Sequence, residues 1–258
     1  MLRRQFEYFC NALVFYSRLP GPARLTYNDT LLARGSRYFP LIGMLLAALG
    51  AAVIYVLAQF LPQSVAVLLG MALLLLSTGA FHEDGLADAC DGFGGGYSPE
   101  KILLIMKDSR IGTYGAAALC MILLARWQTL SLLPLTAMIG VMICAAGLSR
   151  AAAISISLFL PYQRLDLDSK AKPIARNLRR KDVLLAWGFA LLPLLWMPGL
   201  FALLALLCCI AIAILAGRYY LRHLGGYTGD CLGAAQQVCE LAVLLCGLAL
   251  LEAAPAIC

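Results

Sequence analysis

The sequence predicts an all-α protein, a polytopic bundle of membrane helices that forms one domain over residues 1–258. Three observations carry this prediction: the composition, a series of long apolar segments, and the confinement of basic residues to alternate connections. Hydrophobic residues make up 62% of the chain and charged residues 13%, with a mean hydropathy of +0.84. A soluble domain carries about 25% charged and about 45–50% apolar residues, so this composition excludes a water-soluble globule, a disordered chain and a coiled coil.

The N-terminal residues 1–30 are expected to contain an amphipathic helix that lies on the cytoplasmic membrane face. Apolar side chains recur there at helical spacing, at Leu2, Phe6, Phe9 and Leu13. A cleaved signal peptide is excluded, because Glu7 interrupts the apolar region and no small-residue cleavage site follows.

About seven apolar segments follow, each of a length suited to a membrane helix. They cover residues 38–60, 63–81, 113–132, 136–160, 183–197, 199–218 and 231–253. The fifth, at 183–197, is the shortest, and Pro198 and Gly199 after it indicate a tight hairpin to the sixth.

The basic residues orient the bundle in the inner membrane of the cell. They gather before the first segment and after the second, fourth and sixth, whereas the turns near Pro62, Pro134 and Pro198 carry none. The positive-inside rule then places the connections 81–112 and 161–181 in the cytoplasm. The net charge of +6 is explained by this orientation, so no nucleic-acid partner is expected. The basic run 179–181 is either part of the same anchor or a phosphate-binding strip.

An acidic cluster stands where the second segment meets the cytoplasm. Asp84, Asp88 and Asp91 are spaced i, i+4 and i+7, so a helix would carry them on one face, beside Glu83. Like charges at this spacing repel each other, and a divalent cation would remove the repulsion. Hard oxygen ligands with room left for substrate phosphates are typical of a magnesium site. The alternative is a solvated acidic loop.

Glycines and charged residues continue this segment toward the third span. Gly94, Gly95 and Gly96 would let backbone N–H groups approach a phosphate closely, although no G-K-[S/T] ends the run as in a P-loop. Lys107 and Arg110 suit a pyrophosphate, and Asp108 between them suits a bridging metal.

Polar residues also mark the start of the last span. Asp230 is either a helix N-cap or a further metal ligand, and Gln237 lies two turns beyond it, nearly beneath it. Glu240 continues this polar stripe and lies about 15 Å deep, as does Arg150 in the fourth span. A buried charge at that depth needs a partner or water, so the two residues either pair with each other or each line a hydrated cavity.

The motifs together resemble the cobalamin (5'-phosphate) synthase family, also called adenosylcobinamide-GDP ribazoletransferase. The matching stretches are F-Y-S-R-L-P-G-P at 15–22, R-Y-F-P-L-I-G at 37–43, F-H-E-D-G-L-A-D-A-C-D-G-F-G-G-G at 81–96, I-M-K-D-S-R-I-G-T-Y-G at 105–115 and G-G-Y-T-G-D at 225–230. The resemblance implies a multi-pass inner-membrane enzyme that uses Mg²⁺ to join adenosylcobinamide-GDP to α-ribazole or its 5'-phosphate, with release of GMP.

The resemblance also implies roles for individual residues. The metal would be held by the five aspartates Asp84, Asp88, Asp91, Asp108 and Asp230. Asp84 and Asp88 would also be catalytic, and His82 could take the proton of the attacking hydroxyl, which an aspartate could do as well. Gly94, Gly95, Gly96, Lys107, Arg110 and Gln237 would bind substrate.

Two alternatives remain at this point. The acidic order also looks like that of the CDP-alcohol phosphotransferases, but their D-G-x-x-A-R differs from the sequence here. A cation transporter would favour internal repeats with broken helices at the midplane, whereas these carboxylates cluster at the cytoplasmic rim. The bilayer is an expected partner, and a homo-oligomer is left open.

Overall fold

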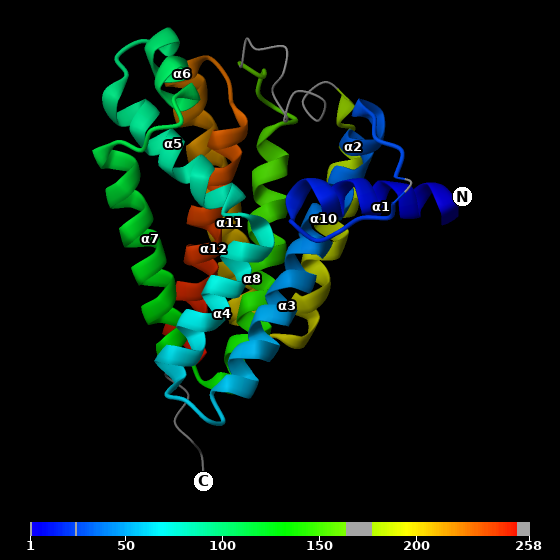
Figure 1. Ribbon diagram of the computed structural model, residues 1–258, viewed down its shortest axis with the longest axis vertical. Coiled ribbons are helices and arrows are strands. Elements are labelled where there is room, and N and C mark those ends of the chain that lie inside the picture. Colours follow the sequence, from blue (N-terminus) through cyan, green and yellow to red (C-terminus); the bar gives the residue numbers. More distant parts are fainter. Residues whose placement is uncertain (1, 24, 164–176, 252–258) are drawn as a thin grey trace.

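The computed structural model describes residues 2–23, 25–163 and 177–251, and these form a helical bundle. The helices are α1 (Leu2–Tyr16), α2 (Asp29–Gly35), α3 (Phe39–Leu57), α4 (Gln63–Thr78), α5 (Phe81–Gly95), α6 (Pro99–Lys107), α7 (Thr113–Leu132), α8 (Leu135–Ile156), α10 (Arg180–Leu191), α11 (Gly199–Leu224) and α12 (Gly229–Leu251). Most of them run along the long axis of the molecule (Figure 1). No β-strand occurs in the described part of the chain, so the predicted all-α bundle is confirmed.

The count of membrane-length helices is lower than the predicted seven. Among the described residues, five helical segments are long and apolar enough to cross a bilayer: Asp29–Leu57, Thr113–Leu132, Leu135–Ile156, Gly199–Leu224 and Gly229–Leu250. The pair α4 and α5 makes a sixth if it is one bent span. The segment predicted at 183–197 does not qualify, because α10 ends at Leu191 and Pro193 follows within a short 3₁₀ turn, Leu192–Trp196.

The connection predicted as a loop at 81–112 is mostly helical, since it holds α5 and α6. The break between α4 and α5 comes from two consecutive left-handed residues, Gly79 (φ 67°) and Ala80 (φ 54°), which bend the chain by 85°. An L-residue such as Ala80 pays about 1–2 kcal/mol for this conformation. The left-handed φ of Gly79 favours glycine, and a Cβ there would also displace the side chain of Arg18. The bend turns the acidic segment across the upper end of the bundle in Figure 1.

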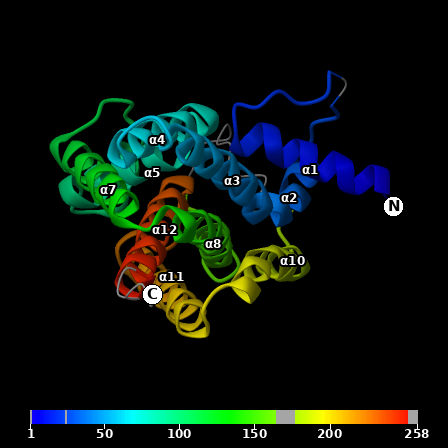
Figure 2. The same ribbon diagram turned by 90° about the horizontal axis from the view of Figure 1, so that it is seen from below.

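Helix α8 forms the centre of the bundle. It packs against α3, α12, α10 and α11, which surround it in Figure 2. Of its most apolar stretch 78% is buried inside the protein, against 17% for α11. Small residues, among them Ala145, Ala146, Ala151 and Ala152, allow neighbouring helices to approach its backbone closely.

The upper end of the bundle, which we call the charged end, carries α1, α2, α5, α6 and the first turn of α10. Helix α1 lies across the bundle rather than along it (Figure 1), with Leu2 and Phe6 exposed. Buried Asp182 at the start of α10 accepts hydrogen bonds from Arg34 (2.7 Å) and Arg37, which ties α10 to the segment before α3. Most of the predicted connection 161–181 lies outside the described residues, as does the C-terminal part of the segment predicted at 231–253.

Candidate functional site

The two acidic segments predicted from the sequence meet where α5 crosses α12. A Cβ added to Gly85 would lie 3.2 Å from the Cα of Asp230, and one added to Gly233 would lie 3.1 Å from the carbonyl oxygen of His82. Glycine on both helices therefore lets the backbones touch. On α5, Asp84 and Asp88 flank this crossing; Asp84 is exposed, and Asp88 and Asp230 are half-buried. The crossing therefore brings the backbone of Asp230 against the stretch of α5 that carries Asp84 and Asp88, which are three of the five predicted metal ligands.

Asp91 has a structural role that the sequence did not reveal. Its Oδ2 accepts a hydrogen bond from the backbone N–H of Gly112 (2.7 Å), and its Oδ1 accepts one from Gly115 (2.8 Å). These N–H groups belong to the start of α7, which has no capping side chain of its own. Asp91 thus caps α7 from a distance, and a negative charge is favourable at that position.

Asp108 and Arg110 bind each other rather than the α5 acids. The guanidinium of Arg110 donates to both carboxylate oxygens of Asp108, from Nε to Oδ1 at 3.1 Å and from Nη2 to Oδ2 at 2.6 Å. These hydrogen bonds hold the pKa of the Asp108 carboxyl below its usual value. The pair lies in the exposed connection between α6 and α7, where Lys107 ends α6.

The glycines at 94–96 have a role in helix packing, in addition to any role in ligand binding. A Cβ on Gly94 would lie 2.6 Å from the ring of Tyr114, and one on Gly96 would lie 2.8 Å from the carbonyl oxygen of Gly92. Gly95 has more room, with its nearest neighbour, the Ile105 Cδ1 atom, at 3.3 Å. The run therefore lets the end of α5 fold against α6 and α7.

The donor set allows a test of the predicted magnesium site. Within the described part of the chain, no group of three or more His, Cys, Asp or Glu side chains is close enough to hold a metal ion. Asp91 and Asp108 lie away from the helix crossing and bind other partners, and the acids at the crossing are Asp84, Asp88 and Asp230, whose Oδ2 accepts a hydrogen bond from Thr228. Mg²⁺ is usually held by one or two carboxylates together with waters and substrate phosphates. One or two of the carboxylates at the crossing, together with the phosphates of a bound substrate, fit this donor set, whereas a site built from protein carboxylates alone does not.

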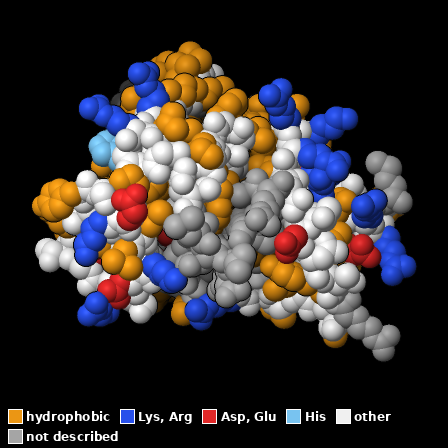
Figure 3. Space-filling view, turned by 90° about the horizontal axis from the view of Figure 1, so that it is seen from above, with side chains coloured by type: hydrophobic (Ala, Val, Ile, Leu, Met, Phe, Trp, Pro, Cys, Tyr) orange, Lys and Arg blue, Asp and Glu red, His pale blue; other side chains and the backbone are white. Residues whose placement is uncertain are grey.

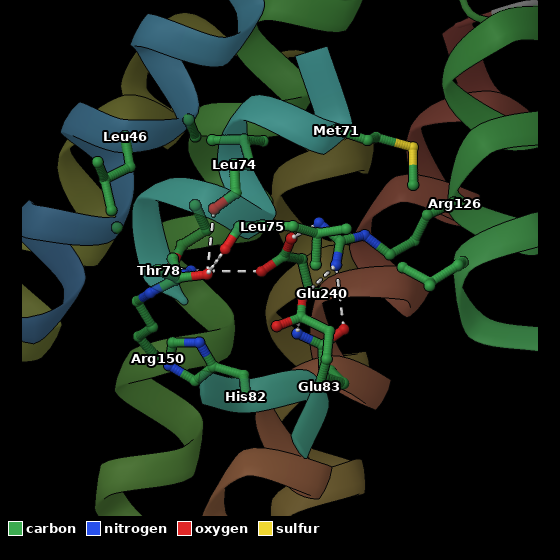
Figure 4. Close-up of a pocket in the computed structure, with 15 residues that line it drawn as sticks. Leu46, Met71, Leu74, Leu75, Thr78, His82, Glu83, Arg126, Arg150 and Glu240 are labelled. Atoms are coloured by element: carbon green, nitrogen blue, oxygen red, sulfur yellow. Dashed lines mark hydrogen bonds and ion pairs between the residues drawn. The ribbon is translucent and has the colours of Figure 1, made fainter. Parts of the chain in front are cut away.

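Below the crossing, four buried charged side chains form a network (Figure 4). Arg126 on α7 contacts Glu240 on α12 at 2.7 Å and Glu83 on α5 at 3.2 Å. Arg150 on α8 contacts the other oxygen of Glu240 at 3.3 Å. The predicted pairing of Arg150 with Glu240 is confirmed, and the absence of a side chain at Gly43 makes room for Arg150. The two positive and two negative charges balance, as burial requires.

Two glutamines complete this network. Gln237 accepts from Arg126 (3.0 Å) and donates to Glu83 (3.0 Å), and Gln236 donates to Glu240. Gln237 was predicted to bind substrate, whereas here its side chain is buried and joins α12 to α5 and α7. Arg126 was missed as a partner. Its position as a lone charge in an apolar span was the available signal.

The network borders a cavity lined by polar atoms without partners. His82 Nε2, Glu83 Oε2 and Arg126 Nε are buried and have no hydrogen-bond partner. All three residues line the same space together with Arg150 and Glu240 (Figure 4). Arg150 and Glu240 therefore pair with each other and also line a cavity. The two alternatives that the sequence left open apply together. Unsatisfied buried polar groups of this kind attract water or a ligand.

A second pocket adjoins the crossing on the side of α1 and α3. It has about 520 Å³ of empty space, part of it open to solvent, and Phe15, Phe39, Phe81 and Tyr227 line it together with His82. The ring of His82 stacks on that of Phe39, with centroids 5.6 Å apart. No Asp, Glu, Lys or Arg lines it among the described residues, and Gly229, next to Asp230, borders it. We call this space the aromatic pocket.

Comparison with known proteins assigns the chain to a family. The family model described as cobalamin-5-phosphate synthase matches residues 8–249. The chain belongs to the cobalamin-5-phosphate synthase family. Relatives named adenosylcobinamide-GDP ribazoletransferase include one from Ralstonia pickettii, 47% identical over 94% of this chain and 95% of its own length. One from Shewanella amazonensis is 45% identical over 94% of this chain and 95% of its own length. One from Vibrio cholerae is 44% identical over 98% of this chain and 97% of its own length.

The matched region contains every site residue of this synthase discussed above, which confirms the resemblance recognised from the motifs. No solved structure matches the chain. Seen from above, Lys and Arg side chains lie around much of the rim of the charged end, with fewer Asp and Glu among them (Figure 3). An anion that approaches this end of the bundle meets a positive potential.

Proposed function

We propose that this synthase joins adenosylcobinamide-GDP to α-ribazole, or to α-ribazole 5'-phosphate, and releases GMP. We place the reaction at the cytoplasmic face of the inner membrane, with Mg²⁺ as the cofactor. The observation that supports the proposal is the glycine crossing of α5 and α12 at the charged end, where a Cβ on Gly85, which lies between Asp84 and Asp88 in the sequence, would come within 3.2 Å of the Asp230 Cα. The substrates follow from the name of the relatives, adenosylcobinamide-GDP ribazoletransferase.

The proposed reaction is a displacement at phosphorus. The 3'-hydroxyl oxygen of the ribazole forms a bond to the phosphorus attached to cobinamide, the bond from that phosphorus to the bridging oxygen breaks, and GMP leaves. Asp84, Asp88 and Asp230 are the residues that would hold the metal. When bound, a divalent cation neutralises charge on the phosphate oxygens of such a substrate. Lys107 and the backbone N–H groups at Gly94–Gly96 would bind the remaining phosphate charge, and we assign Arg110 to the same task once a phosphate competes with Asp108.

The aromatic pocket suits the base of the acceptor. The base of ribazole is flat and apolar apart from one ring nitrogen, so it can stack on aromatic side chains without losing hydrogen bonds. Guanine carries donors and acceptors on its edges, which this pocket would leave unpaired. His82 borders the pocket and has an unpartnered Nε2, and we assign it the proton of the attacking hydroxyl.

The direct experiment is an assay of the full chain in phospholipid vesicles. Adenosylcobinamide-GDP, α-ribazole and Mg²⁺ are supplied, and adenosylcobalamin and GMP are measured by mass spectrometry. Asp84→Asn should lower turnover by at least about 100-fold, or about 2.7 kcal/mol in transition-state free energy. Glu100→Gln is the matched control, because it removes an exposed carboxylate from neighbouring α6. A folded wild-type chain that forms no product would refute the proposal, and turnover of a CDP-linked donor instead would favour the phosphatidyltransferase alternative.

A further inference from the structure

An apolar groove lies on the opposite side of α8 from the ion network. Helices α10 and α11 each pack against α8 but barely contact each other, as Figure 2 shows from below. The space between them amounts to about 790 Å³, part of it open to the surroundings. Its floor is formed by Ala152 and Ile156 of α8, and its walls by Trp187 of α10 and Ile214 of α11. We call it the α8–α10–α11 groove.

The groove lies in the half of the bundle nearest the charged end. Its lining comes from the last turns of α8 and the second half of α11, whereas the turn that joins α10 to α11, at 197–199, lies at the other end. The two helices therefore separate toward the charged end. Phe159 is 81% exposed, Ile214 55% and Leu221 50%, so the groove opens sideways through apolar side chains. In a bilayer these side chains face the hydrocarbon of one leaflet.

One charged residue lines the groove among the described residues, and it is a cation. Arg218 lies on α11 within one turn of Leu221 and has no hydrogen-bond or ion-pair partner in the described part of the chain. An arginine near the end of a membrane helix extends toward the headgroup region, where its guanidinium can bind a phosphate with two hydrogen bonds. Arg180, Lys181 and Arg222 are exposed at the same end and add positive potential.

We propose that the α8–α10–α11 groove binds one anionic glycerophospholipid of the membrane. An acyl chain lies on α8 between α10 and α11, and the lipid phosphate lies at Arg218. The apolar lining suits the chain, the open side faces the leaflet from which a lipid would enter, and the single cation selects the headgroup. Helix α10 is too short to cover this side of α8, so the bound lipid would cover the part that α10 leaves open.

Trp187 provides a direct test, because it lines the groove. A chain that keeps Trp187 as its only tryptophan is made by Trp127→Phe and Trp196→Phe and placed in phosphatidylcholine vesicles. A brominated-chain lipid is added as phosphatidylglycerol or as phosphatidylcholine at the same mole fraction, and fluorescence quenching is measured. We expect an about fivefold preference for phosphatidylglycerol, the equivalent of about 1 kcal/mol for one basic residue near the surface. If the double variant does not fold, the difference between wild type and Trp187→Phe gives the same quantity.

Matched variants distinguish the binding of the acyl chain from the selection of the headgroup. Gly217→Leu should fill the groove and reduce quenching, because a Cβ there meets only Leu160 Cδ1, at 3.8 Å, whereas Gly188→Leu adds the same side chain to an exposed position outside the groove. Arg218→Gln should abolish the preference for phosphatidylglycerol, and Arg222→Gln, on the same helix outside the groove, should retain most of it. Equal quenching by the two brominated lipids, or unchanged quenching in Gly217→Leu, would overturn the proposal.

Discussion

The buried charge network makes a quantitative prediction about coupling between Arg150 and Glu240. Replacing Glu240 by alanine leaves Arg126 and Arg150 with only Glu83 to balance them, so one buried positive charge is uncompensated. Removing one partner of a buried ion pair costs about 3–5 kcal/mol of unfolding free energy. Replacing Arg150 by alanine leaves one negative charge uncompensated, but Glu240 keeps its shorter contact with Arg126, at 2.7 Å. We expect that loss to be near the lower end, about 3 kcal/mol.

The double replacement of Arg150 and Glu240 restores neutrality, because Arg126 and Glu83 remain paired. Its cost should therefore be smaller than the sum of the single costs by about 2–3 kcal/mol, the upper part of the range for directly interacting residues. The coupling of Arg126 with Glu240 should be larger still, since that contact is 2.7 Å rather than 3.3 Å. The pair Arg150 and Glu83 is the control, because these two described residues also carry opposite charges but make no direct ion-pair contact.

The assay is reversible unfolding of the purified full chain in mixed micelles with increasing sodium dodecyl sulfate. Unfolding free energies of the single and double alanine variants give the three coupling energies. Additive losses for Arg150 and Glu240 would refute the pairing. A coupling of Arg150 with Glu83 as large as that with Glu240 would show that overall neutrality, rather than the contacts, stabilises the site.

Three further predictions follow from the site and the orientation. Activity of the wild-type chain should vanish with a chelator and return with Mg²⁺, and Asp88→Asn should abolish turnover with an unchanged unfolding curve; full activity without a divalent ion contradicts the proposed site. Asp91→Asn should instead lower the unfolding free energy by about 1–2 kcal/mol, because its amide nitrogen would face a backbone N–H at the start of α7; a stability equal to that of wild type would show that the cap is unimportant. In intact cells, an impermeant thiol reagent should label Phe60→Cys and leave Tyr97→Cys unlabelled, since these exposed positions lie at opposite ends of the bundle; the reverse pattern would invert the orientation.

The resemblance to the family rested on short motifs with their order along the chain, and it was sufficient to recognise the family. It was less informative about what each motif residue does. Asp91 belongs to a recognised stretch, and the resemblance assigned Gln237 to substrate binding, yet Asp91 caps α7 and Gln237 joins three helices. A motif shows which residue types are close in sequence. The residues that their side chains contact lie elsewhere in the chain, so the motif does not identify them.

The sequence by itself determined the helical bundle, the acidic segments and the depth of the buried charges. These properties depend on composition and on position along one helix. Most of the long apolar runs are therefore membrane-length helices, and equal depth made Arg150 and Glu240 candidate partners. Only the tertiary structure decided the 85° bend after α4, the crossing at Gly85 and Gly233, and the entry of Arg126 into the network. The reason is that the rotation of a helix and its choice of neighbour depend on close packing between distant segments, which hydropathy and spacing do not encode.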